Sequence, residues 1–286
     1  MNLIYFVTVN YFSSNLIKKL IDSLEDNQGT KYQLFIVNNS PADGDIAKLQ
    51  SEVVQVIESE DNIGFARACN LGLQNIYNQD PQAIIWLINP DAYLAENSWS
   101  QVLPLLTKHP QISILGTIIH TPNGEFWFAG GRFLTPLGAI LEVDLLSSHL
   151  NKDYVVCDWV SGCSLIINCQ NFSQCPQFDP HYFLYYDDVD FCQKYRNQGH
   201  LVAITQQIAV IHQPSSITNR NVSNKIQHST YSYLYCLAKY TNKLIWLIRF
   251  FRLFIYALIL LLTNPPVGKG KLAGIASYFK YLIVGQ

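Results

Sequence analysis

Three carboxylates lie within four positions of the segment FLYYDDVDFC (183–192), and apolar or aromatic residues surround them. The stretch from Asp187 to the stop at Gly199 is typical of a helix. Acids favour the first turn of any helix, but three exceed what capping requires. Burial and mutual repulsion raise a carboxyl pKa toward values that suit a general base. Since Asp187 and Asp190 share one helical face, Asp188 projects separately and is the candidate base.

Two further side chains have the chemistry to bind a divalent cation. Asp91 comes shortly after the apolar run AIIWLI, and His212 follows IAVI, so each is expected where a strand ends. Carboxylate oxygen and imidazole nitrogen suit Mn²⁺, and the phosphates of a ligand usually share such a site. Each residue also has an ordinary interpretation, Asp91 as a turn residue and His212 as a buried core residue.

A scaffold for these side chains is predicted by the first 120 residues. Amphipathic segments after Ser13 or Ser14, at 65–77 and at 98–109 predict helices. Short apolar runs predict strands at 3–9, 34–37, 53–57, 83–88 and 112–119. This alternation indicates an α/β fold with a mostly parallel sheet flanked by helices. Such sheets bind ligands at the carboxyl ends of their strands, where polar loops follow the first four runs.

Beyond residue 120 the pattern changes. A hairpin is predicted at 121–131, and 154–168 predicts two strands that meet at Ser161-Gly162. Two short strands, 201–205 and 208–212, then lead to the histidine at 212.

The distribution of charge separates the two parts of the chain. Residues 1–190 hold all 21 acids and eight bases, a formal charge of −13, whereas residues 191–286 hold 11 bases and no acid, a charge of +11. The apolar run 244–262 is interrupted by Arg249 and Arg252, so an interfacial or re-entrant helix suits it better than a clean membrane crossing. We expect a basic, apolar helical tail on an anionic membrane surface, with packing on the domain or in a homodimer as the alternative.

Composition narrows the class of protein further. A hydrophobic fraction of 49% in 286 residues excludes a disordered chain. Seven cysteines form no C-x-x-C pair, which argues against a disulfide framework or a zinc site. The first residues, MNLIYFVTVNYF, read as a buried strand without a basic leader, so we expect a cytoplasmic protein, peripheral on the inner membrane face.

An ordered series of motifs resembles family 2 glycosyltransferases of the GT-A (Rossmann-like) fold, in particular the bacterial rhamnosyltransferase-like branch. The series is VTVNY, VNNSPADG, DNIGFARACNLG, LINPDAYL, WVSGCSLII, FDPHYFLYYDDVDFCQKYRNQG and VIH. The resemblance covers roughly residues 3–215. It implies a catalytic domain at 1–225, with a nucleotide-sugar half at about 1–120 and an acceptor half at about 121–225, ahead of a tail at 226–286.

The resemblance also assigns roles to residues. It places Asp188 as the base, with Asp187 in the family's Glu position, and Asp91 with His212 at a Mn²⁺ or Mg²⁺ site. Trp159 and Gly162 would border the acceptor cleft. The donor-binding residues that it implies are Thr8, Asn10, Tyr11, Asn38, Asn39, Asp61, Asn62, Gly64, Asn70 and Asn89.

These assignments imply an inverting transfer of a sugar, with rhamnose as one candidate, from a dTDP- or UDP-linked donor to a cell-surface polysaccharide or lipid-linked glycan. No nucleic acid partner is expected, since the catalytic half is acidic. Asn38 and Asn89 stand where the family usually has Asp, which motivates an alternative: a catalytically idle, membrane-associated scaffold. A nucleotidyltransferase ranks lower, because residues 10–20 lack a glycine-rich basic loop.

Overall fold

The computed structural model describes residues 3–25, 31–95, 98–213 and 222–284. Its strands are β1 (Leu3–Asn10), β2 (Lys31–Asn38), β3 (Val54–Glu58), β4 (Ile84–Ile88), β5 (Ala92–Leu94), β6 (Ile112–His120), β7 (Phe126–Phe128), β8 (Gly131–Leu134), β9 (Ala139–Glu142), β10 (Val155–Val156), β11 (Ser164–Asn168) and β12 (Leu201–His212). Its helices are α1 (Ser14–Glu25), α2 (Phe65–Gln79), α3 (Val102–Lys108), α4 (Asp187–Arg196), α5 (Val222–Tyr240), α6 (Lys243–Thr263) and α7 (Pro265–Val284).

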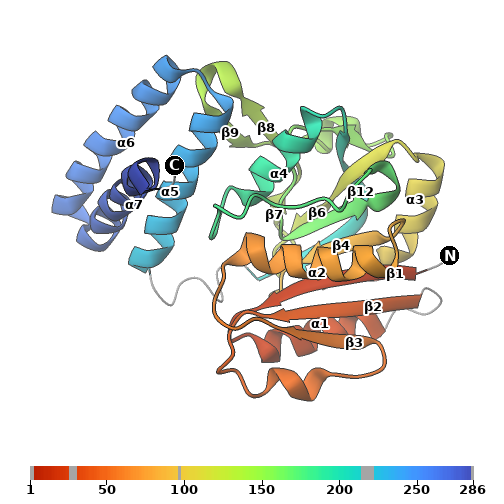
Figure 1. Cartoon of the computed structure of the whole chain (residues 1–286). Coiled ribbons are helices and arrows are strands. Elements are labelled where there is room, and N and C mark those ends of the chain that lie inside the picture. The colour runs from red at the N-terminus through yellow and green to blue at the C-terminus, as the bar shows by residue number, and fades with distance from the viewer. Residues whose placement is uncertain (1–2, 26–30, 96–97, 214–221, 285–286) are drawn as a thin grey trace.

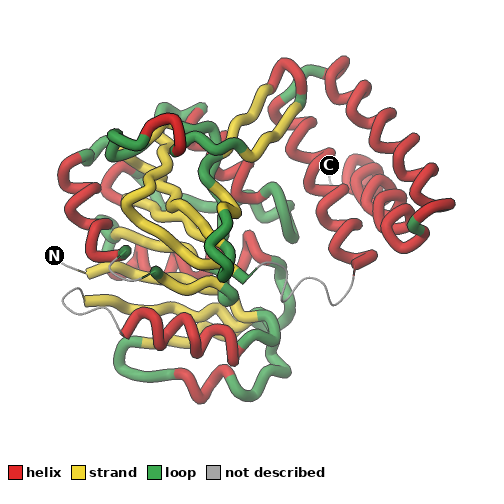
Figure 2. The backbone as a smooth tube through the Cα atoms, turned by 180° about the vertical axis from the view of Figure 1, so that it is seen from behind, coloured by secondary structure: helices red, strands yellow, loops and turns green. Residues whose placement is uncertain are grey.

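The central sheet is mostly parallel, as the sequence predicts. Its strands run in the order β10-β12-β6-β11-β4-β1-β2-β3, and β11 is antiparallel to both of its neighbours. Figure 1 shows α2 in front of the sheet, and Figure 2 shows α1 on the opposite face. The mixed α/β architecture with helices on both faces is therefore confirmed.

Register brings the polar strand ends to one edge. Asn10 at the end of β1 lies beside Asn38 of β2, which lies beside Glu58 of β3. The polar residues thus leave the sheet together because the four parallel strands β1 to β4 all point that way.

Close packing holds the helices on this sheet. A Cβ atom at Gly72 of α2 would lie 2.6 Å from the side chain of Val7, so only glycine allows this approach of α2 to β1. On the other face of β1, the rings of Trp86 and Trp99 contact Phe6, with centroids 5.2 and 6.0 Å away. These large buried side chains close-pack the centre of the sheet.

Two details differ from the sequence prediction. In segment 154–168, β10 pairs with β12 at the sheet edge, while β11 lies between β4 and β6, so the two strands do not meet each other. The two short strands predicted in 201–212 are one strand, β12, because a register shift between Thr205 and Ala209 absorbs the polar pair between them. The predicted hairpin is confirmed, since β7 pairs antiparallel with β6.

The last three helices pack together beside the sheet (Figure 1). By length and composition alone, α6 is long and apolar enough to cross a membrane, and 6% of its most apolar stretch is buried. Its exposed side chains include Leu247, Ile248, Phe251, Ile255 and Leu262. The apolar C-terminal helix is therefore confirmed, whereas the boundary predicted at 225/226 stays a prediction, and α5 continues through it.

Candidate active site

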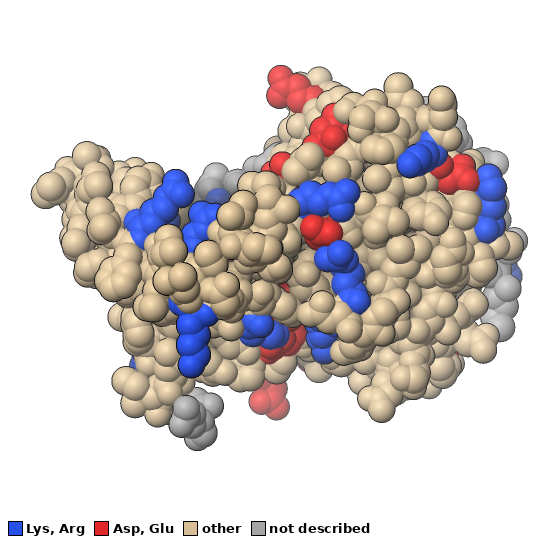
Figure 3. Space-filling model, turned by 90° about the horizontal axis from the view of Figure 1, so that it is seen from above, with Lys and Arg blue, Asp and Glu red and all other residues tan. Residues whose placement is uncertain are grey.

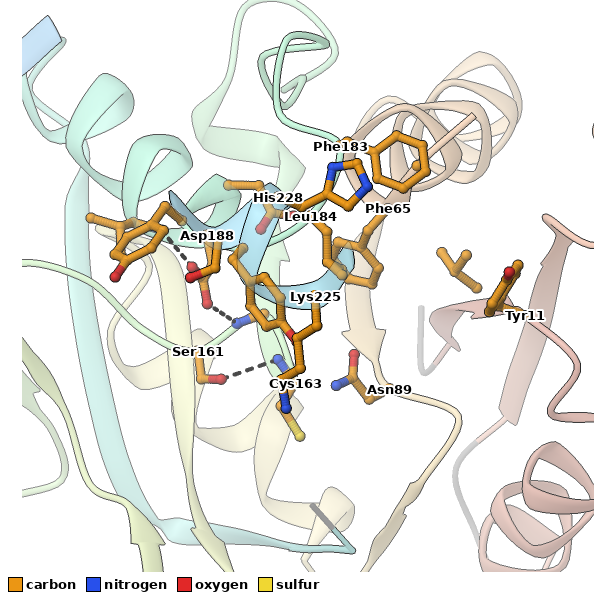
Figure 4. A pocket seen from close by; sticks show the side chains of 18 of the residues that line it. Tyr11, Phe65, Asn89, Ser161, Cys163, Phe183, Leu184, Asp188, Lys225 and His228 are labelled. Atoms are coloured by element: carbon orange, nitrogen blue, oxygen red, sulfur yellow. Dashed lines mark hydrogen bonds between the residues drawn. The ribbon is translucent and has the colours of Figure 1, made fainter. Parts of the chain in front are cut away.

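A cavity of about 850 Å³ opens at the carboxyl edge of the sheet. Its walls come from the strand ends, from the segment before α4, from the β7–β9 region and from the first turns of α5. Figure 4 shows Asp188 and Ser161 on one side of it and Tyr11 on the other, with Lys225 and Asn89 between them. The volume suits a ligand the size of a nucleotide sugar.

Asp188 is half-buried in the cavity wall and held by two backbone amides. The Gly162 N–H donates to its Oδ2 at 2.9 Å, and the Val189 N–H donates to its Oδ1 at 2.8 Å. Burial raises the pKa of Asp188 above its usual range, and these two hydrogen bonds oppose that rise. The carboxylate is therefore oriented yet retains lone pairs for a proton.

The backbone before α4 is strained in a way that positions this acid. Tyr185 and Tyr186, which are not glycines, adopt φ values of +68° and +60°. Such conformations cost roughly 1–2 kcal/mol each and cluster at functional sites. The Phe65 N–H donates to the Phe183 carbonyl at 2.8 Å, and Gly64 (φ +84°) packs against the same residue. The strained segment is thus anchored to the loop that precedes α2.

The other two acids have different environments. Asp187 is buried, and burial together with the negative charge of Asp188 raises its pKa to about 8. Asp190 is fully buried on the far side of α4, where it accepts from Tyr240 Oη at 2.9 Å and pairs with Lys239 at 2.5 Å. Near pH 7 Asp187 therefore keeps its proton, while the backbone N–H groups of Gly162 and Val189 favour the charged form of Asp188.

Asp91 and His212 come together, although 121 positions separate them. β5 pairs with β12 so that Ala92 lies opposite His212, and the Asp91 Oδ1 lies 3.2 Å from the imidazole Nε2. Both side chains are buried, and the Nδ1 of His212 has no hydrogen-bond partner within the described residues. Asn89 lines the cavity beside them.

These residues fit a divalent cation only as a shared site. Among the described residues no group of three or more His, Cys, Asp or Glu gathers as in a closed metal site. One imidazole nitrogen and one carboxylate oxygen leave several positions of a Mn²⁺ shell open, and the phosphates of a ligand supply oxygen atoms of the right kind. The donor set is therefore that of a cation that binds together with its ligand.

Several predicted donor-binding residues line the cavity. Tyr11, Asn39, Asn62, Gly64 and Asn89 do so. The Asn39 side chain donates to Asn62 Oδ1 at 2.8 Å and accepts from the Ile63 N–H at 2.9 Å. This network holds the loop between β3 and α2 closed against the end of β2.

Other predicted donor-binding residues lie behind the wall. Thr8 and Asn10 are buried, and Asn10 donates to Asn38 Oδ1 at 2.9 Å. Asp61 is exposed, and the two side-chain hydrogen bonds of Asn70 hold the backbone of residue 178. None of these five residues lines the cavity.

Asn38, which stands where the family usually has Asp, lies beside a carboxylate from another strand. Its amide nitrogen donates to Glu58 Oε2 at 2.7 Å, so a carboxylate stands at the strand edge although residue 38 is not an acid. The register of β2 and β3 places Glu58 there, and this residue was not predicted from the sequence.

The two predicted acceptor residues both line the cavity. Gly162 lies against Asp188, and the Trp159 ring leaves no room for a side chain at Gly131. The buried Nε1 of Trp159 lies against Gly131 and has no hydrogen-bond partner among the residues that the structure describes.

Three ionisable residues of the cavity wall were not predicted from the sequence. Glu142 lines the rim, where partial burial and the charge of Asp188 raise its pKa. Lys225 and His228 enter from α5, and the His228 ring stacks on Phe183 with centroids 4.4 Å apart. Burial lowers the pKa of His228, which favours a neutral ring. The helical spacing of 225 and 228 was a usable signal, but it lay across the expected domain boundary.

Known proteins share this sequence pattern and fold. The profile of Glycosyl transferase family 2 matches residues 5–160, more than half of the chain. The N-acetylglucosaminyl-diphospho-decaprenol L-rhamnosyltransferase of Mycobacterium tuberculosis is 21% identical over 253 residues, which are 80% of this chain and 82% of that protein.

Two solved structures show the same fold. A mannosyltransferase from Pyrobaculum calidifontis in complex with GDP-Man and Mn²⁺ has a TM-score of 0.57 and 12% identity over 99% of this chain and 76% of that one. GalNAc-T7 with UDP, GalNAc and Mn²⁺ has a TM-score of 0.58 and 14% identity over 81% of this chain. This chain covers about half of the GalNAc-T7 chain, 47%.

Proposed function

The chain belongs to glycosyl transferase family 2, in its rhamnosyltransferase-like branch, and on that premise we propose that it transfers a sugar with inversion, using Asp188 as the general base. The observation that carries the proposal is the placement of one carboxylate, oriented by two backbone N–H groups, in the wall of a cavity of nucleotide-sugar size. The donor is a nucleoside-diphosphate sugar, and the acceptor is a hydroxyl group of a glycan or lipid-linked glycan.

The donor lies across the carboxyl edge of the sheet. Tyr11 and the Asn39–Asn62 pair contact the nucleoside, and Asp91 with His212 faces the diphosphate. In this proposal Asp91 and His212 hold a Mn²⁺ or Mg²⁺ ion that, when bound, offsets the charge of the leaving diphosphate. The relatives' complexes with Mn²⁺ support a divalent cation. Lys225, in the same cavity, adds a positive charge to this region.

The acceptor enters on the side of Gly162 and Trp159. Its hydroxyl group donates a proton to Asp188 as the oxygen attacks the anomeric carbon, and the nucleoside diphosphate leaves from the opposite face. One base suffices for this single displacement, since no covalent sugar intermediate forms. Asp187, protonated near pH 7, keeps a second negative charge away from the base.

A donor screen tests this function directly. Release of nucleoside diphosphate is measured from UDP-, dTDP- and GDP-sugars, with and without Mn²⁺, and one donor is expected to react. Binding of a donor without turnover, in every acceptor mixture tried, would instead favour the idle scaffold suggested by Asn38 and Asn89. The match to a glycosyl transferase family gives no support to the nucleotidyltransferase alternative.

We also propose that the protein works at the inner face of the cell membrane. The apolar exposed side chains of α6 and the excess of basic residues in the tail support this location. Vesicles containing phosphatidylglycerol are expected to bind the full chain, and Leu262→Glu, at an 88% exposed position of α6, is expected to weaken binding.

The control is Leu150→Glu, at a 69% exposed position in the catalytic half. Equal binding by both variants would contradict the location. The competing arrangement is a homodimer through α6, which light scattering of the lipid-free protein tests.

A further inference from the structure

A second cavity, of about 770 Å³, lies between α5, α6 and α7. Tyr186 and Ser229 line both this cavity and the candidate active site. Since Tyr186 stands two positions before Asp188, the second cavity adjoins the acceptor side of the first. The two cavities are therefore neighbours across a thin wall of side chains.

The second cavity is positively charged. Arg249, Arg252 and Lys271 line it, and no acid does so among the described residues. Burial raises the pKa of Tyr233 in the same wall, and the charges of Arg249 and Arg252 oppose that rise, which places both guanidinium groups near this ring. In the left part of Figure 3, where the tail helices lie, Lys and Arg appear without Asp or Glu.

Two of these cations are fixed in position. The Arg249 guanidinium donates from Nε and Nη2 to the Leu137 carbonyl at 2.9 and 2.7 Å. The Lys271 ammonium is half-buried, 5.6 Å from the ring centroid of Tyr256, and burial lowers its pKa. A partly buried cation without an adjoining carboxylate favours an anionic ligand.

An apolar stripe leaves this cavity along α6. Ile255 and Ile259 line the cavity, and Leu262 follows at helical spacing with 88% of its surface exposed. Cations at one end and an open apolar stripe at the other fit an anionic head group with a hydrocarbon chain.

We propose that this second cavity binds the diphosphate and the first part of the hydrocarbon chain of a lipid-linked acceptor. Arg252 and Lys271 contact the phosphates, and the chain runs along Ile255 and Ile259 of α6. The sugar on the diphosphate then reaches past Tyr186 toward Asp188. The inference rests on the proposed glycosyl transfer and specifies how its acceptor is held.

A membrane phospholipid explains the site less well. A diphosphate carries two neighbouring phosphate groups, and their negative charges match the several cations in this cavity. Moreover, the shared wall with the active site is useful only if the bound molecule also carries the group that reacts. In an acceptor whose diphosphate joins a lipid to a sugar, the lipid matches the apolar stripe of α6, the diphosphate matches the cations, and the sugar lies toward the active site.

The test uses the full chain in detergent with farnesyl diphosphate as the probe, and binding is measured by calorimetry. The cavity variant is Arg252→Gln combined with Lys271→Gln. The control is Lys269→Gln combined with Lys280→Gln, which removes the same charge from exposed positions of α7 that do not line the cavity. We expect the cavity variant to bind about tenfold more weakly or worse, and the control to bind like wild type.

Three results would overturn the inference. Equal weakening by the control would indicate bulk attraction by the basic tail. Equally tight binding of farnesol would show that the phosphates are not recognised. Dependence of phosphatidylglycerol vesicle binding on the cavity pair, with farnesyl diphosphate binding unchanged, would assign the site to a membrane lipid.

A separate readout keeps this inference distinct from the proposed function. Slow release of nucleoside diphosphate from the donor to water, without acceptor, reports on the catalytic cavity alone. Both variants are expected to retain it at the wild-type rate. If wild type releases none with any donor, in water or in any acceptor mixture, the proposed function fails; if release is normal and the cavity variant binds farnesyl diphosphate like wild type, only the acceptor site fails.

Discussion

Replacement of Asp188 by asparagine removes the proposed base with little change in shape. The side-chain oxygen can still accept from one backbone amide, either Gly162 or Val189, but the new NH₂ group faces the other amide and cannot accept. Loss of one hydrogen bond to a charged acceptor lowers the free energy of unfolding by about 1.5–3 kcal/mol. The variant should remain folded, which thermal unfolding checks.

The expected effect on activity is larger. General base catalysis contributes about 10²–10⁴-fold, so kcat should fall by that factor, equivalent to roughly 2.7–5.4 kcal/mol of activation free energy. The assay is release of nucleoside diphosphate at saturating donor and acceptor. The donor KM should change little, because Asp188 faces the acceptor side of the cavity.

A neighbouring residue provides the matched control. Asp187, whose pKa of about 8 keeps it protonated near pH 7, resembles asparagine in charge and shape in the wild-type enzyme. Asp187→Asn should therefore retain activity within about tenfold. Wild-type turnover by Asp188→Asn, or equal losses in both variants, would refute the assignment of the base.

Three further predictions follow from the same contacts. Asp187 has a folded pKa of about 8 against a usual value of 3.8, so between about pH 4 and pH 8 the unfolded chain releases this proton while the folded protein keeps it, and stability falls as pH rises. Asp187→Asn should therefore raise Tm relative to wild type at a pH of about 8 or above but not at about pH 4, and equal shifts at both pH values would contradict this. Gly64→Ala should lower the free energy of unfolding, measured by denaturant, by at least about 1–2 kcal/mol, because φ is +84° and the new Cβ would lie 2.7 Å from the Phe183 carbonyl. The control is Gly44→Ala, where the new Cβ would have no atom within 4 Å. Lys239→Met should lower the free energy of unfolding by about 3–5 kcal/mol, since it leaves the fully buried Asp190 carboxylate without its cation. Lys48→Met, from a fully exposed pair, should leave the denaturation midpoint nearly unchanged, and similar midpoints for the two variants would rule out the buried pair as a major contributor.

The sequence by itself determined the local elements and singled out one carboxylate. Short apolar runs and helical spacing are local properties, so β1 to β4 and α4 could be predicted from neighbouring residues alone. Helical spacing predicted that Asp188 lies apart from Asp187 and Asp190. The structure shows this for Asp190, which lies against Lys239, whereas Asp187 lines the cavity together with Asp188.

Only the tertiary structure decided which distant residues meet. The contact between Asp91 and His212 depends on the pairing of β5 with β12. The carboxylate of Glu58 lies beside Asn38 because of the register of β2 with β3. Pairing and register minimise exposed apolar surface and unpaired backbone groups over the whole sheet, so no local pattern encodes them. The same reason applies to Lys225, because a helix outside the sheet can line its cavity only where packing of the whole chain brings it there.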